Sequence, residues 1–142
     1  MNDLGETGLN LLLFSVGEVH FGIDSEQVAG INAFQGEDAG DLFWFHNEMG
    51  FGDATVTYLL PTVVTIRCPD EQPYRVIIDL MEDIREIATD SILPFPPLLE
   101  PFALRKGMWG VLLVEGKMVL LVDFMRILRE KTAVSARHGG DE

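Results

Sequence analysis

The sequence is poor in the residues from which covalent and metal-based sites are built. It contains a single cysteine, Cys68, and three histidines among 142 residues. One cysteine excludes an intramolecular disulfide and a cysteine-based zinc cluster, and it fits a reducing compartment, so we expect a cytoplasmic protein. Cys68 has Arg67 as its one basic neighbour and no base partner beside it, so we expect an unreactive thiol.

Basic residues are also scarce, with 10 Lys and Arg against 23 Asp and Glu. The formal net charge of −13 repels nucleic-acid phosphates and anionic lipid headgroups, which disfavours both classes of partner. No uncharged stretch reaches the ~20 residues of a membrane-spanning helix. Residues 1–6 contain no basic residue, so we expect neither membrane insertion nor an export signal. Such acidity can serve solubility alone or attract a basic partner.

Motifs of common enzyme classes are missing. We find no glycine-rich phosphate loop, no serine elbow and no helical histidine pair around a glutamate. His46 and Glu48 could point to one side of a strand, but two ligands do not make a metal site. Asp79 and Asp123 each end an apolar run, yet the residues after them are not those of an aspartic protease. We therefore expect no enzymatic activity, no metal and no cofactor.

Length and patterning predict one mainly β domain. A chain of 142 residues with 47% apolar residues can fill one core, so we expect a single domain over residues 1–142 with flexible ends at about 1–8 and 135–142. Short apolar runs recur with turn signals between them, such as Gly17-Glu18 and Glu115-Gly116. This rhythm is typical of a barrel or sandwich of short strands.

The last third predicts a β-hairpin followed by a capped helix. Two aliphatic runs between Gly110 and Val122 flank the turn Glu115-Gly116-Lys117. Asp123 can then accept hydrogen bonds from the free N–H groups of a first helical turn, and apolar residues recur at helical spacing at Phe124, Ile127 and Leu128.

Two further segments predict capped helices. The run Val76-Ile77-Ile78 ends in Asp79, and the apolar residues after it stand at roughly helical intervals, at Leu80, Met81, Ile84 and Ile87. Asp24 stands three residues before Gln27 and is expected to start a short helix over residues 27–31 that Gly30 closes. Alanine at Asp79 or Asp123 should cost about 0.5–2 kcal/mol as a lost cap.

Four prolines fall between Ile92 and Pro101 and exclude both a helix and a central strand there. We expect an extended crossover between two halves of the domain, because its apolar side chains favour burial, namely Leu93, Phe95, Leu98 and Leu99. The alternative is an exposed SH3-type ligand from Pro94 to Pro97. A Phe95→Ser substitution, which destabilises the domain only in the first case, distinguishes the two.

The order of these elements resembles the CheW-like domain, an adaptor module of bacterial chemosensory arrays that also occurs as the regulatory domain of their histidine kinases. The matching segments are 11–17, 20–23, 27–31, 77–81 and 110–128, whereas residues 35–74 depart from the pattern. The resemblance implies two small five-stranded β-barrels with short helices around a shared core. It also implies a non-catalytic cytoplasmic adaptor that couples chemoreceptors to a histidine kinase, or binds another CheW-like protein. The alternative is a small acidic β-barrel enzyme or ligand-binding protein outside chemosensory signalling.

The resemblance places partner contacts in a hydrophobic groove between the barrels. Val28 occupies the valine position of the family's Val-Arg-Glu motif, but Ala29 and Gly30 replace the charged pair. The family's Asn-Leu-Arg-Gly motif falls on residues 47–50, which puts Met49 at the arginine position. The resemblance therefore implies that the usual polar contacts are absent.

An aromatic-rich segment, Leu42–Phe51, offers a replacement for those contacts. Its four aromatics and a methionine exceed what one strand can bury on a single face. Either a covering loop buries the second face, or the outward side chains form a hydrophobic contact patch. Val28, Trp44 and Met49 are the candidate partner-binding residues. A Met49→Glu substitution is then expected to weaken partner capture and leave the melting temperature nearly unchanged.

Overall fold

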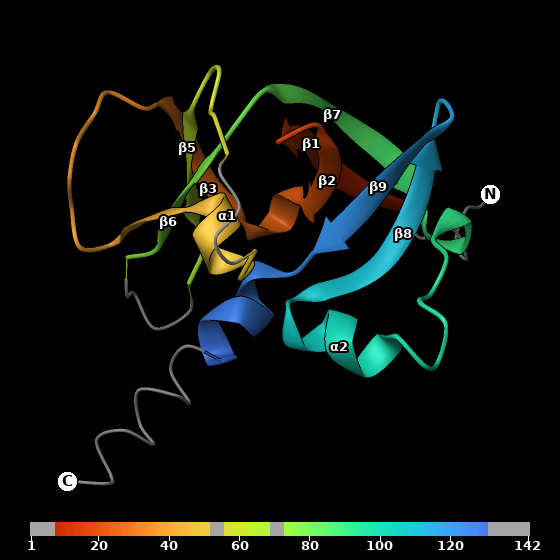
Figure 1. Cartoon of the computed structure of the whole chain (residues 1–142). Helices are drawn as coiled ribbons and strands as arrows, with labels where there is room; N and C mark the ends of the chain where they lie inside the picture. Colours follow the sequence, from red (N-terminus) through yellow and green to blue (C-terminus); the bar gives the residue numbers. More distant parts are fainter. Residues whose placement is uncertain (1–7, 52–55, 69–72, 131–142) are drawn as a thin grey trace, which may run out of the picture.

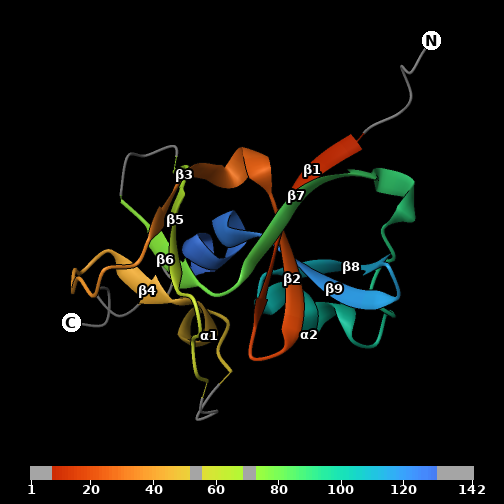
Figure 2. The ribbon, with the colours of Figure 1, turned by 90° about the horizontal axis from the view of Figure 1, so that it is seen from above.

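Two β-sheets share one hydrophobic core in the computed structural model, which describes residues 8–51, 56–68 and 73–130 (Figures 1 and 2). The terminal sheet comes from the two ends of the chain and contains β1 (Gly8–Val16), β2 (Val19–Asp24), β7 (Met81–Ala88), β8 (Met108–Val114) and β9 (Lys117–Val122). Its strand order is β7-β1-β2-β9-β8. The middle sheet has the order β3-β5-β6-β4 and contains β3 (Val28–Ala33), β4 (Leu42–Trp44), β5 (Thr62–Ile66) and β6 (Arg75–Ile78).

The helices are short and connect the strands. They are η1 (Ser25–Gln27), α1 (Phe45–Glu48), η2 (Thr89–Ser91) and α2 (Glu100–Arg105), and residues 124–130 are also helical. The prediction of a mainly β protein with short helices is thus confirmed. Within the described residues the middle sheet has four strands instead of the expected five, and neither ladder closes into a barrel. The expected flexible ends lie outside the described residues, except for Gly8, which begins β1.

Both predicted hairpins are present in the terminal sheet. Gly17 and Glu18 join β1 to β2 with φ of 58° and 69°, and Glu115 and Gly116 join β8 to β9 with φ of 52° and 81°. Two consecutive residues with positive φ match the right-handed twist of the flanking strands. The two hairpins then meet through parallel pairing of β2 with β9, so the ends of the chain form one sheet.

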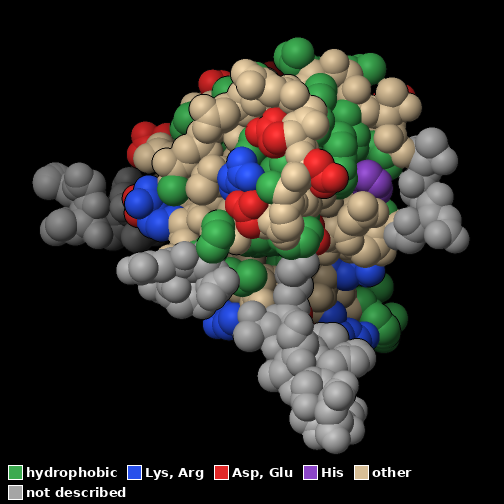
Figure 3. Space-filling model, turned by 90° about the vertical axis from the view of Figure 1, so that its left-hand side faces the viewer, with side chains coloured by type: hydrophobic (Ala, Val, Ile, Leu, Met, Phe, Trp, Pro, Cys, Tyr) green, Lys and Arg blue, Asp and Glu red, His purple; other side chains and the backbone are tan. Residues whose placement is uncertain are grey.

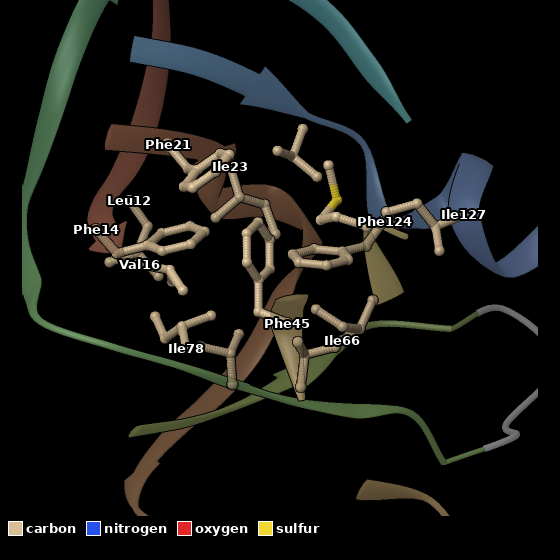
Figure 4. Close-up of a cluster of buried hydrophobic side chains, with 14 of the residues drawn as sticks. Leu12, Phe14, Val16, Phe21, Ile23, Phe45, Ile66, Ile78, Phe124 and Ile127 are labelled. Carbon is tan, nitrogen blue, oxygen red and sulfur yellow. The ribbon is translucent and has the colours of Figure 1, made fainter. Parts of the chain in front are cut away.

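Phenylalanine rings from the terminal sheet, from α1 and from the helix at 124–130 fill the shared core (Figure 4). Phe45 in α1 lies at the centre, with ring centroids 5.1 Å from Phe14, 4.7 Å from Phe21 and 6.0 Å from Phe124. A second cluster lies on the opposite face of the terminal sheet and contains Leu11, Leu13, Leu112, Val119 and Leu121. Both faces of this sheet are therefore covered by apolar side chains.

The cap predicted at Asp123 is confirmed. Its Oδ1 accepts hydrogen bonds from the N–H groups of Met125 at 3.0 Å and Arg126 at 3.3 Å. Gln27, which the sequence did not connect with this helix, donates from Nε2 to the same oxygen at 2.9 Å and accepts the Phe124 N–H at 3.0 Å. One amide side chain thus ties the junction between β2 and β3 to the start of the last helix.

The helix predicted after Asp79 is wrong, because residues 81–88 form the strand β7. Leu80 adopts a φ of 39° and turns the chain between β6 and β7. The Asp79 carboxylate is buried and accepts the N–H groups of Leu59 at 2.9 Å and Leu60 at 2.6 Å. Asp79 therefore fastens the loop before β5 and caps no helix.

The two aspartates should differ in what their removal costs. Asp123→Ala should lower the free energy of unfolding by about 0.5–2 kcal/mol, the usual effect of a lost helix cap. Asp79→Ala should cost about 1–3 kcal/mol, because it leaves two backbone N–H groups without their acceptor beside the core. Urea unfolding of both variants measures the two losses, and a larger loss in Asp123→Ala than in Asp79→Ala would contradict the separate roles.

The short helix predicted over 27–31 is also wrong. Asp24 Oδ1 accepts the Glu26 N–H at 3.0 Å and caps η1 as expected, but η1 ends at Gln27. Gly30 lies in β3 opposite Thr65, beside a register shift in the ladder with β5. Pairing along β5 therefore decides the conformation, although Ala29 and Gly30 are poor strand formers.

The proline-rich segment is extended only in its first part. Leu93 pairs with Val111 on the outer side of β8, whereas Pro101 lies in the first turn of α2, where a missing N–H does no harm. The exclusion of a helix here was therefore wrong. The expected burial also fails for Leu93, Leu98 and Leu99, which are 50%, 81% and 52% exposed, whereas Phe95 is partly buried.

Candidate interaction surfaces

The structure does not bring the three predicted partner-binding residues together. Val28 and Trp44 lie in β3 and β4, the opposite edge strands of the middle sheet. Val28 is half-buried against the shared core. Trp44 lies opposite Ile77 in the ladder with β6, and Ile77 is buried outside that core.

Met49 is buried in the shared core and is 1% exposed, so its prediction as an exposed contact residue is wrong. The sequence suggested a strand through this segment, but β4 ends at Trp44 and α1 begins at Phe45. Residues four apart lie on one side of a helical turn, which directs Met49 to the same side as Phe45. The interface assigned to Met49 must therefore lie elsewhere.

Trp44 is the centre of an aromatic group, which we call the Trp44 cluster and define as Phe34, Trp44, His46 and Tyr58. The Trp44 ring centroid lies 5.4 Å from that of Phe34 and 4.7 Å from that of Tyr58, both in edge-on geometry. The Tyr58 hydroxyl accepts the His46 N–H at 3.2 Å and lies 3.0 Å from His46 Nδ1. Phe34 and Tyr58 come from loops. Trp44 is therefore packed against loop residues, as in the alternative in which a covering loop buries the second face of the segment.

Charged groups on the same side of the molecule include a bidentate ion pair. Arg75 donates to both carboxylate oxygens of Asp41, at 2.7 and 3.1 Å, and this hydrogen bonding lowers the pKa of Asp41 and raises the pKa of Arg75. Glu37 lies 3.9 Å from the same guanidinium, and backbone N–H groups lower its pKa. Figure 3 shows a basic side chain among acidic ones on this face. Asp41 neutralises the charge of Arg75, and Glu37 leaves this face with a net negative charge.

Both tyrosines are shielded from water, which gives a pH prediction. Burial raises the pKa of Tyr58 to about 12. Burial, and then the 2.6 Å hydrogen bond from the Tyr74 hydroxyl to Glu48 Oε1, raise the pKa of Tyr74 well above its usual range. Folding thus favours the protonated phenols, and this stabilisation is complete below about pH 10 and is lost as the pH rises toward 12.

At about pH 10.5 the folded protein should show little tyrosinate absorbance, whereas the urea-unfolded chain should show most of it. A pH titration followed by near-ultraviolet absorbance measures this directly. Tyrosinate formation with the ordinary midpoint in the folded protein would contradict the burial of both rings.

The helix α2 follows the proline-rich segment and lies next to β8 (Figure 1). Exposed apolar side chains gather at this end of the segment. We call this group the α2 patch and define it as Leu98, Leu99, Phe102 and Arg105. Phe102 is 58% exposed, and the Arg105 guanidinium lies 4.9 Å from its ring centroid. Ala103, on the other side of the helix, is buried. The sequence contains a signal for this patch, because Leu98 and Phe102 are four residues apart and would lie on one side of a helix. The neighbouring prolines argued against a helix there.

The described residues offer little material for a chemical site. Their buried polar side chains are Ser15 and Asp79, and Asp79 is occupied by the loop before β5. In the same ranges no three His, Cys, Asp or Glu side chains lie close enough to hold a metal ion. Cys68 is partly buried, with its Sγ 3.5 Å from the Ile66 carbonyl oxygen. None of the described helices has the length and apolarity needed to cross a membrane.

The arrangement of both sheets matches a solved structure, the scaffolding protein TtCheW from Thermoanaerobacter tengcongensis. The TM-score is 0.61, and the match covers 82% of this chain and 90% of that chain at 16% sequence identity. The chain has the CheW fold. No protein-family model matches the sequence, and comparison with curated proteins finds no match.

The CheW-like fold predicted from the sequence is confirmed through its architecture. Residues 35–74, which depart from the family's sequence pattern, contribute the strands β4 and β5 to the middle sheet and also form the helix α1. The sequence departure therefore does not remove the strands of the middle sheet. The Asn-Leu-Arg-Gly position assigned to residues 47–50 falls on the end of α1 and the turn after it, with Gly50 at a φ of 70°.

Proposed function

We propose that this protein is a single-domain, non-catalytic scaffold of a bacterial chemotaxis-type signalling system, acting in the cytoplasm. It couples a chemoreceptor to the regulatory domain of a histidine kinase, or binds another CheW-like protein. The observation that carries the proposal is the shared fold with the scaffolding protein TtCheW, which extends over both sheets. The two aspartates support a non-catalytic role, because Asp79 fastens the loop before β5 and Asp123 caps the last helix.

We assign one contact surface to the α2 patch. Leu98, Leu99 and Phe102 are each more than half exposed and stand together on one short segment. Aromatic and arginine side chains commonly anchor protein interfaces, and the patch offers both in Phe102 and Arg105. A partner with an apolar surface and a nearby carboxylate complements this chemistry.

Val28 and Trp44 remain our candidates for a second contact surface on the middle sheet. The side of the molecule that carries the Trp44 cluster is acidic, with Glu37 and Asp41 around Arg75. A partner that contacts this side would therefore present basic residues. Surfaces on both sheets would allow the protein to hold two partners at once.

Binding of purified partner domains tests the proposal. We expect the protein to bind the cytoplasmic domain of a chemoreceptor, or the regulatory domain of a chemotaxis histidine kinase, from the same genome in isothermal titration calorimetry. Phe102→Ser should weaken one of these affinities about tenfold or more. Its melting temperature should hardly change, because Phe102 is more than half exposed.

Leu113→Ser is the matched control, since Leu113 is 63% exposed at the far end of β8 and lies outside the α2 patch. It should leave both affinities unchanged. Absence of binding to every receptor and kinase domain would overturn the proposed function. Binding that survives Phe102→Ser but is lost in Trp44→Ala would move the contact to the middle sheet.

A further inference from the structure

The strand β7 forms a long open edge of the terminal sheet. It runs over eight residues, pairs with β1 on one side, and has no strand on its other side in the described parts of the chain. Figure 2 shows it passing over the sheet beside β1. An edge strand presents backbone N–H and C=O groups that another strand can pair with.

A bulge in β7 places two apolar side chains on one face of this edge. The ladder shifts between Leu13 and Phe14, so Ile84 lies opposite Leu12 and Met81 lies opposite Phe14. Leu12 and Phe14 are buried in the shared core, whereas Met81 is 41% and Ile84 is 53% exposed. A strand added outside β7 would cover both side chains and extend the face that carries the core.

The backbone of β7 is accessible from the same side. The Ile84 N–H donates to the carboxylate of its neighbour Asp83 at 2.8 Å, so it does not take part in the ladder with β1. Alternate residues of an antiparallel strand point their backbone groups the same way, which directs those of Glu86 outward as well. The Ile84 N–H is therefore bonded to the side-chain carboxylate of Asp83, which an incoming strand can displace.

The charge of the edge defines the partner that fits. The strand carries Glu82, Asp83 and Glu86 against a single basic residue, Arg85. Arg85 is already held by Glu115 at 3.3 Å and by Asp83 at 3.8 Å, and Glu82 faces His20 at 3.3 Å. The edge is thus acidic. Pairing of two copies through β7 would place like charges along the same ladder, which is unfavourable.

We propose that the open edge of β7 binds an extended segment of a partner protein in which apolar and basic residues alternate. The segment adds a strand to the terminal sheet, its apolar side chains cover Met81 and Ile84, and its basic side chains, which point to the opposite face, meet Glu82 and Asp83. Backbone hydrogen bonds supply affinity in this mode, and alternate side chains supply specificity. The inference does not depend on the adaptor function and stands apart from the α2 patch.

The test uses the full chain and a blocked peptide of about nine residues, within the usual length of a strand, in which valine and lysine alternate. We expect saturable binding and slowed hydrogen exchange at the backbone amides of Ile84 and Glu86. A peptide in which glutamate replaces lysine, and one with N-methylated backbone amides, should both fail to bind. Glu82→Lys should weaken binding of the lysine peptide about tenfold and allow the glutamate peptide to bind.

Binding of the N-methylated peptide with equal affinity would overturn strand addition, since only side chains would then be involved. Protection at amides outside β7 alone, or no binding at millimolar peptide, would also overturn the proposal. A dimer in sedimentation analysis that Ile84→Pro abolishes would show that the occupant is a second copy. If Ile84→Pro does not fold, the comparison of the N-methylated and unmodified peptides still tests strand addition on the parent protein.

Discussion

Replacing Met49 with glutamate is expected to lower the free energy of unfolding by about 4–5 kcal/mol, a large part of the total stability of an ordinary domain. Met49 is 1% exposed and packs in the shared core after α1. A carboxylate there would lose its hydration among apolar side chains, which is among the costliest single changes in a folded protein. Circular dichroism and urea unfolding measure the effect.

Met49→Leu is the matched control, because it keeps the volume and apolar character of the site, and it should cost less than about 1.5 kcal/mol. If Met49→Glu instead stayed folded with nearly the melting temperature of the parent, Met49 would be a surface residue. That outcome would contradict the packing of α1 against the core.

Phe45→Ala is expected to cost about 3–5 kcal/mol, because the ring lies at the centre of the aromatic core. Phe45 is fully buried and contacts Phe14 and Phe21 of the terminal sheet as well as Phe124 of the last helix. Its removal leaves a cavity between the two sheets that the surrounding rings can fill only in part. Chemical denaturation gives the loss of stability.

Phe102→Ala provides the comparison for Phe45→Ala, since it removes the same atoms from an exposed position in α2. It should change the free energy of unfolding by no more than about 0.5 kcal/mol. Similar losses in the two variants would contradict either the burial of Phe45 or the exposure of Phe102.

Local patterns predicted the hairpins and the cap at Asp123, because turn residues and short-range alternation determine them. The strand β7 was missed for a reason that the structure makes plain. The bulge at Glu82 adds one residue to the strand, which moves Ile84 onto the face of Met81. A spacing of three on one face is also the spacing of a helix, so periodicity alone could not separate the two.

The candidate contact residues depended on contacts that no local pattern contains. Trp44 and Met49 belong to one apolar segment, but β4 gives way to α1 between them and directs their side chains to different environments. The α2 patch was missed because proline in a first helical turn was treated as a helix breaker. The ion pairs at the open edge of β7 also depend on residues that are distant in the sequence. His20 lies beside Glu82, and Glu115 lies beside Arg85.

Parallel pairing of β2 with β9 has a consequence for the order in which the protein can assemble. The strands of the middle sheet lie in one continuous stretch and can pair as soon as that stretch is synthesised. The first hairpin is made earliest, yet it must wait for β9 to arrive from the other end of the chain before Phe21 is covered on all sides. Closing so long a loop slows folding. The nascent N-terminal hairpin is therefore the segment most exposed to misassociation during synthesis.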